Sequence, residues 1–303
     1  MKALASFTMR GRSQAAMVAA AAAVLSLVVP LVGLVSSAAV ALVTLRQGAA
    51  EGLLVGLFAG LASGLLAFLV LGSPLPAIGF ALALWLPVLL LAVVLRHARS
   101  LGVAVQLAGL FGLLILAVIH LQTGDPATFW AELLEPVRQN LVDSQVIDDA
   151  GSEALVAQVA RWMTGAFSAT FYFQVVLALF LGRWWQALLY NPGGFGEEFR
   201  ALRLHPATGY AALVLTLVVS FGESNLWAAE LLLLLMPLFF LQGVAVVHGL
   251  AAAFEAHKAW LIGFYALLVL AMPHGQILVA GLGLLDIWMD VRARVGARNE
   301  HEG

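Results

Sequence analysis

The chain of 303 residues contains no cysteine, and its charged residues are scarce. The lack of cysteine excludes disulfide bonds, thiolate metal ligands and cysteine nucleophiles. Asp, Glu, Lys and Arg make up 11% of the sequence, whereas a soluble globular protein carries about 25%. The net charge of −2 argues against a nucleic-acid partner. Enzyme motifs such as G-x-S-x-G and H-E-x-x-H are also missing, so the sequence predicts no enzyme, no catalytic residue, no metal site and no cofactor.

Hydrophobic residues are abundant instead. They form 62% of the chain, and the mean hydropathy is +0.99. A membrane-spanning helix needs about 20 consecutive apolar residues. Continuous apolar stretches lie at 49–71, 76–95, 101–121, 163–189, 207–221 and 225–253. The sequence therefore predicts an all-α integral membrane protein, with one transmembrane domain over residues 1–303 that contacts the lipid bilayer.

Two further apolar regions are longer and interrupted. Residues 14–45 contain Pro30 and Gly33, and residues 258–289 contain Pro273 and Gly275. Proline and glycine interrupt helices, so each region is predicted to form two short helices joined by a tight turn. Each pair is either two full passes or one re-entrant hairpin, and both alternatives leave the later loops on the same side. The prediction is a polytopic bundle of eight to ten membrane segments.

The basic residues set the orientation of this bundle. With both interrupted regions treated as hairpins, thirteen of the fifteen Lys and Arg residues fall on one side. Cytoplasmic loops carry such an excess. We therefore expect both termini to be cytoplasmic in a multi-pass membrane protein. The residues on that side are Lys2, Arg10, Arg12, Arg46, Arg96, Arg99, Arg183, Arg200, Arg203, Lys258, Arg292, Arg294 and Arg298.

The segment 122–162 is the long external loop in this topology, and it is acidic. Seven Asp and Glu residues oppose Arg138 and Arg161. Within it, FWAELLEPVRQNL and SEALVAQVARWM place apolar residues at helical spacing. They predict short helices lying on the outer face of the membrane. The acidic surface either screens cationic solutes or is simply a solvated face.

Small residues recur every fourth position in two of the predicted helices. Such spacing puts them on one helix face, and lipid-embedded helices pack closely through small residues. This predicts helix packing inside the bundle, or docking of a partner subunit or second copy. The residues are Gly52, Gly56, Gly60 and Gly64, with a matching face at Ala15, Ala19 and Ala23.

Residues 191–206, NPGGFGEEFRALRLHP, hold an unusual density of charge, glycine and proline for this chain. We predict a cytoplasmic loop, 190–206, with a turn followed by a short helix. Glu197 and Glu198 suit the start of that helix, where the dipole favours anions. Arg200 and Arg203 can reach lipid phosphates. The loop is interpreted as an interfacial anchor, with a partner-docking surface as the alternative.

Ionisable residues within membrane spans are costly and are candidate sites for that reason. Glu230 stands alone in a 29-residue apolar segment. The predicted topology brings four other residues near the same external end: His120, Trp227, His274 and Gln276. They predict an outward-facing ligand pocket, in which His274 or a cationic or hydrogen-bonding solute partners Glu230. The alternative is that each residue caps its own helix end.

Three stretches carry a resemblance to a known family. They are GGFGEEFRALRLHP (193–206), QGVAVVHG (242–249) and GLLDIWMDVRAR (283–294). The chain resembles the YybS-like bacterial membrane proteins, a family of unknown function grouped with the S-components of energy-coupling-factor transporters. The resemblance implies an S-component-like helical core with extra helices and a place in the bacterial inner membrane, and no established activity comes with it.

Two functions remain open at this point. The first is a membrane subunit that binds or transports a small solute, as S-components do. The second is a structural or assembly protein that docks partner proteins through its small-residue faces and its loops. Retention of a solute through purification favours the first, and a stable complex with another membrane protein favours the second.

Overall fold

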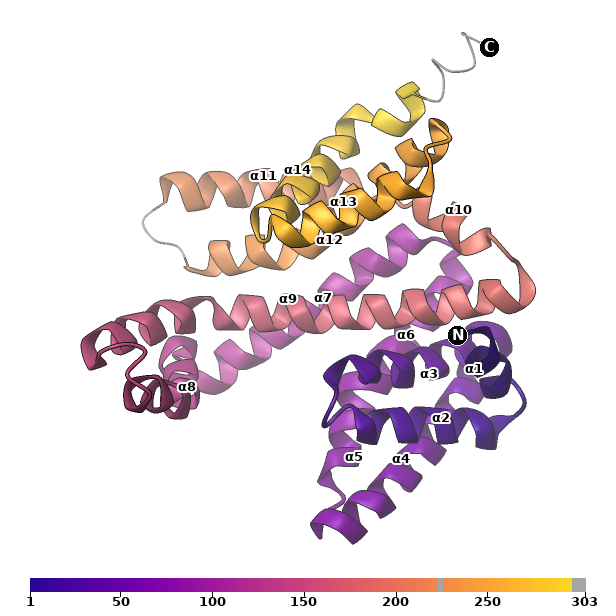
Figure 1. Cartoon of the computed structure of the whole chain (residues 1–303), viewed down its shortest axis with the longest axis horizontal. Coiled ribbons are helices and arrows are strands. Elements are labelled where there is room, and N and C mark those ends of the chain that lie inside the picture. The colour runs from indigo at the N-terminus through magenta and orange to yellow at the C-terminus, as the bar shows by residue number, and fades with distance from the viewer. Residues whose placement is uncertain (223–225, 296–303) are drawn as a thin grey trace.

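The computed structural model describes residues 1–222 and 226–295, whose regular structure is entirely helical (Figure 1). Asn225 and Arg298, which enter the predicted span and the predicted charge pattern, lie outside the described residues. The elements in chain order are α1 (Lys2–Thr8), α2 (Arg12–Leu25), η1 (Pro30–Val32), α3 (Gly33–Gln47), α4 (Ala49–Leu71), α5 (Leu75–Phe80), η2 (Ala81–Trp85), α6 (Leu86–Ala98), α7 (Leu101–Thr123), α8 (Pro126–Asp143), α9 (Asp149–Tyr190), α10 (Gly194–Arg200), α11 (Pro206–Phe221), α12 (Leu226–Ala253), α13 (Lys258–Leu270) and α14 (His274–Met289).

Within the described residues, six helical segments are long and apolar enough to cross a membrane, so the chain is a helical membrane protein. They are Pro30–Gln47, Ala49–Leu71, Leu75–Ala98, Leu101–Thr123, Asp149–Tyr190 and Leu226–Ala253. Four apolar helices, α2, α11, α13 and α14, have only 13 to 16 residues. At 1.5 Å per residue they extend about 20–24 Å, less than the hydrocarbon core of about 30 Å.

Both interrupted regions break where the sequence predicts. α2 ends at Leu25, and the next element, η1, begins at Pro30. α13 ends at Leu270 and α14 begins at His274. Proline lacks a backbone N–H, so it cannot continue a helix from the preceding turn, but it is tolerated in the first turn of a helix. Pro30 accordingly begins a new element after α2 has ended. α2 packs against α3 and α4.

The longest helix, α9, runs across the whole molecule (Figure 1). It has 42 residues, which corresponds to about 63 Å and twice the hydrocarbon thickness. The expected separate helix in SEALVAQVARWM is therefore wrong, because that stretch is continuous with the membrane helix. The other expected external helix exists as α8, and it packs against α9. α8 and the first part of α9 thus project together from one end of the bundle.

The four glycines of α4 do not all face the interior of the bundle, as the prediction required. Gly52 is buried, and a Cβ added there would lie 1.9 Å from Thr44 Oγ1 of α3. A Cβ on Gly56 would meet nothing within 4 Å, so the expected close packing at Gly56 is wrong within this chain. Gly60 and Gly64 are partly buried beside Trp85 and Ala77, with ordinary to tight spacing. The buried face instead continues from Gly52 through Val55, Ala59, Ser63 and Ala67.

The predicted alanine face of α2 lies inside the bundle. Ala15, Ala19 and Ala23 are fully buried, and α2 contacts α3 and α4. Small residues also bring α9 against α3, because a Cβ added to Gly182 would lie 2.7 Å from the Cβ of Ala41. Helices in lipid pack by such close approach, since no hydrophobic force drives them together.

The arginines tie together segments that meet at one end of the molecule, here called the basic end. Arg46 stacks on Tyr190 with its Cζ 4.2 Å from the ring centroid. Figure 1 places the N-terminus on the side of α10, while α8 lies at the opposite, acidic end. The pairs that join segments at the basic end are Arg12–Glu51, Arg96–Leu45 O, Arg183–Glu198, Arg203–Asp290 and Arg292–Arg200 O.

Candidate functional site

A buried histidine–glutamate pair joins two helices near the acidic end. His120 lies in the last turn of α7, and Glu230 in the second turn of α12. His120 Nε2 is 2.7 Å from Glu230 Oε2, and the two side chains are 8% and 1% exposed. A carboxylate removed from water needs a partner or a proton. The partner of Glu230 is His120, so the expected partnership with His274 is wrong.

Trp227 forms one wall of this pair. Its ring stacks on the His120 ring with the centroids 3.7 Å apart and an interplanar angle of 25°. Trp227 precedes Glu230 by three residues, and residues three apart share a face of a helix. Trp227 is 50% exposed, whereas the His120 side chain is 8% exposed, so the indole covers the imidazole on the outer side of the bundle.

A glycine of α9 lets this helix pack closely against Glu230, so that α9 joins α7 and α12 around the pair. A Cβ added to Gly165 would lie 3.1 Å from the Cα and 3.2 Å from the Cβ of Glu230. The neighbouring Thr164 accepts a hydrogen bond of 2.8 Å from Trp130 Nε1, and both side chains are buried. α7, α9 and α12 therefore surround the pair, and α8 is fixed beside it.

A cavity of about 580 Å³ lies about one helical turn from the pair, because Leu226 precedes Glu230 by four residues and Arg161 precedes Gly165 by four. Neither His120 nor Glu230 is among its lining residues. Its lining includes Leu226 and Ala229 of α12 together with Gln158, Arg161 and Trp162 of α9. Ala229 directly precedes Glu230 in the chain. Among the described residues that line it, Arg161 is the charged one, and a guanidinium pairs with carboxylates and phosphates. The lining thus favours a solute with a negative or hydrogen-bond-accepting group, whereas Glu230 alone suggests a cationic one.

The remaining two predicted ligand residues lie elsewhere. Gln276 lines a different cavity of about 400 Å³, bordered by α9, α12 and α14, whose lining is otherwise mostly apolar. His274 is exposed at the start of α14. The structure therefore brings together three of the five residues, His120, Trp227 and Glu230, and separates the other two from them.

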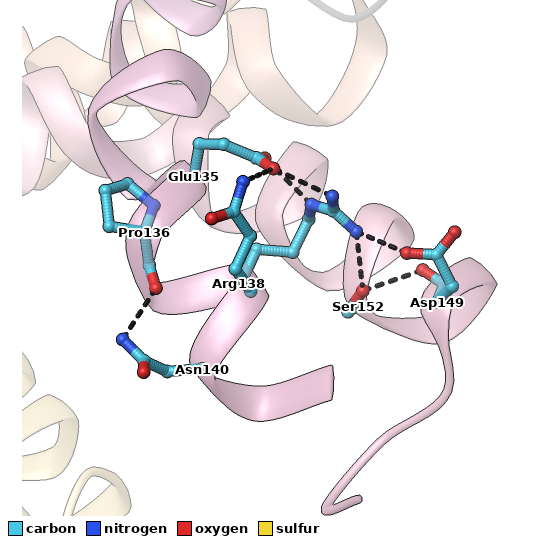
Figure 2. A network of polar contacts seen from close by, with 7 residues as sticks. Glu135, Pro136, Arg138, Asn140, Asp149 and Ser152 are labelled. Carbon is cyan, nitrogen blue, oxygen red and sulfur yellow. Dashed lines mark hydrogen bonds and ion pairs between the residues drawn. The ribbon is translucent and has the colours of Figure 1, made fainter. Parts of the chain in front are cut away.

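The acidic segment 122–162 is organised around Arg138 (Figure 2). This side chain donates to Glu135 at 2.8 and 2.7 Å and to Asp149 at 2.5 Å, which links α8 to the start of α9. The hydrogen bonds from Arg138, followed by one from Gln139, lower the pKa of Glu135 to about 2. Arg138 thereby offsets part of the acidic charge and holds α8 in place over α9.

The charged loop 190–206 packs on the protein through several of its side chains. Glu198 receives two hydrogen bonds from Arg183 of α9, and Arg203 pairs with Asp290. Leu202 and Leu204 are buried, whereas Glu197 is exposed in the first turn of α10. The interfacial anchor and the docking surface both stay predictions.

A buried polar network at the basic end is not evident from the sequence. Gln242 of α12 is fully buried, accepts from Leu204 N at 2.9 Å and donates to Asp286 Oδ2 at 3.1 Å. Arg292 donates to the same oxygen at 2.8 Å, and its Nη1 donates to the carbonyl of Arg200. The sequence alone suggests that Asp286 lies at the wet end of the last helix, yet it is buried and paired. The network fastens the loop to α12 and α14.

Comparisons with known proteins add no identity to this picture. No family model, no curated protein and no solved structure matches the chain. The resemblance to the YybS-like family stays a prediction that rests on its three short motifs. Over residues 1–222 and 226–295, no group of three His, Cys, Asp or Glu side chains is placed to hold a metal ion.

Proposed function

We propose that this membrane protein binds a small polar solute at its acidic end, in the cavity beside His120 and Glu230. The observation that carries the proposal is a carboxylate that is 1% exposed and hydrogen-bonded to a histidine, whose ring stacks on a tryptophan. This group lies about one helical turn from a cavity of about 580 Å³. Such groups within a membrane bundle are expensive to bury, and they commonly mark solute or ion pathways. Arg161 supplies the opposite charge in the same cavity. The predicted S-component-like core fits this function.

The test is whether a small molecule stays bound through gentle purification. We expect the parent protein in mild detergent to carry a polar small molecule near one per chain, detected by mass spectrometry after extraction. Glu230→Gln keeps an acceptor for His120 and should preserve the fold, but removes the charge. The substitution weakens the charge-assisted hydrogen bond between His120 and position 230, a bond of about 1.5–3 kcal/mol that joins α7 to α12 beside the cavity. We therefore expect occupancy to fall about tenfold or more.

Two control variants make this result specific. Glu132→Gln removes an exposed carboxylate from α8 and should retain the molecule like the parent. Arg161→Gln should lose the molecule if the negative group of the solute lies in the cavity. A parent protein without bound solute, or equal occupancy in the parent and Glu230→Gln, would overturn the proposal.

We further propose that the basic end faces the cytoplasm of a bacterial cell and that α8 lies outside. This topology rests on the predicted excess of basic residues on one side. The contacts that Arg96, Arg183 and Arg203 make with other segments at the basic end support it. The proposed topology has eight to ten membrane segments. The four shorter helices either pair as hairpins or cross the membrane where the bilayer is locally thinner.

Single cysteines test the orientation directly, because the chain has none of its own. Ser144 and Ala201 are both exposed, near the end of α8 and after α10 respectively. On intact cells, an impermeant thiol reagent should label Ser144→Cys and should leave Ala201→Cys unlabelled until the cells are opened. The reverse pattern would invert the topology, and labelling of both sites would exclude it.

One observation favours the alternative, an assembly protein that docks partners. α13 contains no buried residue, although it is a strongly apolar helix of 13 residues. A second membrane subunit or another copy of this chain could cover it. The mass of the gently purified protein distinguishes the two functions, because a stable complex without bound solute supports assembly and a monomer with bound solute supports solute binding.

A further inference from the structure

A second, smaller cavity lies at the basic end, far from the proposed solute site. Its volume is about 240 Å³, and it is bordered by the ends of α3, α6 and α9 and by α10. Three arginines and one glutamate line it, with a net charge of +2, and Gln186 adds an amide. The charged residues are Arg96, Arg99, Arg183 and Glu198.

Two of these guanidinium groups are held in place by the fold. Arg96 donates from Nη1 to the carbonyl of Leu45 at 2.7 Å. Arg183, whose side chain is 12% exposed, donates from Nε to Glu198 Oε2 at 2.9 Å and from Nη2 to the second oxygen. A guanidinium has five N–H donors, so both groups keep donors for a further acceptor. Fixing them in advance lowers the entropy cost of binding.

The third arginine supplies charge that no carboxylate among the described residues offsets. Arg99 is exposed and caps the C-terminus of α6. Among the described residues, no carboxylate lies within 4.0 Å of a nitrogen of Arg96 or Arg99. The negative end of the α6 dipole accounts for about half a charge. It does not account for three arginines gathered around one hollow.

We propose that this cavity binds a phosphate-bearing anion. Arginine forks match the tetrahedral oxygens of phosphate with paired N–H donors, and Gln186 can donate a further hydrogen bond. Glu198 orients Arg183 without cancelling the charge of the other two arginines. The cavity lies where three apolar helices end, which is the level of lipid headgroups, and basic pockets between membrane helices bind such headgroups. The phosphate belongs either to an anionic phospholipid or to a free phosphate compound.

The decisive variant is Arg99→Gln, because this side chain has no ion-pair partner to lose among the described residues. Native mass spectrometry measures binding of phosphatidylglycerol, with phosphatidylcholine as the neutral comparison. We expect Arg99→Gln to bind phosphatidylglycerol about fivefold more weakly than the parent, in line with the contribution of one basic residue at a membrane surface. Arg99→Lys should recover most of the binding, and Arg10→Gln, an exposed arginine outside the cavity, should bind like the parent.

A parallel melting experiment separates the two sources of phosphate. If inorganic phosphate raises the melting temperature of the parent above that in chloride of equal ionic strength, and Arg99→Gln abolishes this shift, the site takes free phosphate. If only phosphatidylglycerol distinguishes the two proteins, the site takes a lipid. Equal behaviour of the parent and Arg99→Gln in both measurements overturns the proposal. So does an equal loss in Arg10→Gln, because surface charge alone would then explain the binding.

Discussion

Gly283→Ala should lower the melting temperature of the purified protein by several degrees, although it adds a single methyl group. A Cβ at this position would lie 2.0 Å from the carbonyl oxygen of Phe239 and 2.6 Å from the amide nitrogen of Gly243. Both are backbone atoms of α12, so no side-chain rotation can relieve the contact. α12 and α14 would have to move apart. Overpacking of this kind costs about 3 kcal/mol.

The matched control lies two residues away on the same helix. A Cβ on Gly281 would meet nothing within 4 Å. Alanine favours helix over glycine by about 1 kcal/mol, so Gly281→Ala should be neutral or slightly stabilising. Thermal unfolding in one detergent, followed by tryptophan fluorescence, compares the variants. Equal melting temperatures would show that α12 and α14 are not in backbone contact at Gly283.

Asp286→Leu should be comparably damaging, for an electrostatic reason. Asp286 is 1% exposed at its side chain and pairs with Arg292, which is 10% exposed. Removing the carboxylate leaves a buried guanidinium without its partner and takes away the acceptor of Gln242. Breaking a buried pair from one side costs about 3–5 kcal/mol. The double variant Asp286→Leu/Arg292→Met should recover a large share of this loss, because no unpaired charge remains.

The control for this experiment is the neighbouring surface pair. Asp290 and Arg203 have side chains that are 36% and 53% exposed, and exposed pairs contribute about 0–1 kcal/mol. Asp290 has φ 44°, a left-handed conformation that asparagine also tolerates. Asp290→Asn should therefore melt close to the parent. If Asp286→Leu also melts close to the parent, the network at the basic end does not stabilise the fold.

The long spans are predictable from the sequence because their signal is local. The apolar runs 49–71 and 101–121 match α4 and α7 within two residues. The continuity of α9 is harder to predict. The hydropathy of the sequence changes at the membrane surface even when the backbone continues as one helix. No proline occurs between residues 149 and 190, so the lack of a helix breaker is the available signal for one helix.

Pairings between distant segments are not predictable in the same way. Helical spacing shows that Gly52 and Gly56 share a face, but it does not show which edge of that face turns inward. Likewise, a common depth places both His120 and His274 near Glu230, and only the lateral packing of α7 against α12 selects His120. The burial of Asp286 is hidden from the sequence because its partner Arg292 follows a sharp change of direction at Asp290.

The unbroken length of α9 has a consequence for the two proposed sites. Gly165 packs against Glu230, and Arg183 lines the arginine cavity, so one rigid rod forms a wall of both. These positions are about 27 Å apart along the axis at 1.5 Å per residue. A ligand that shifts α9 at one site would change affinity at the other if the second ligand prefers one of the two positions of the helix. Thermodynamic reciprocity would then require the same factor in both directions.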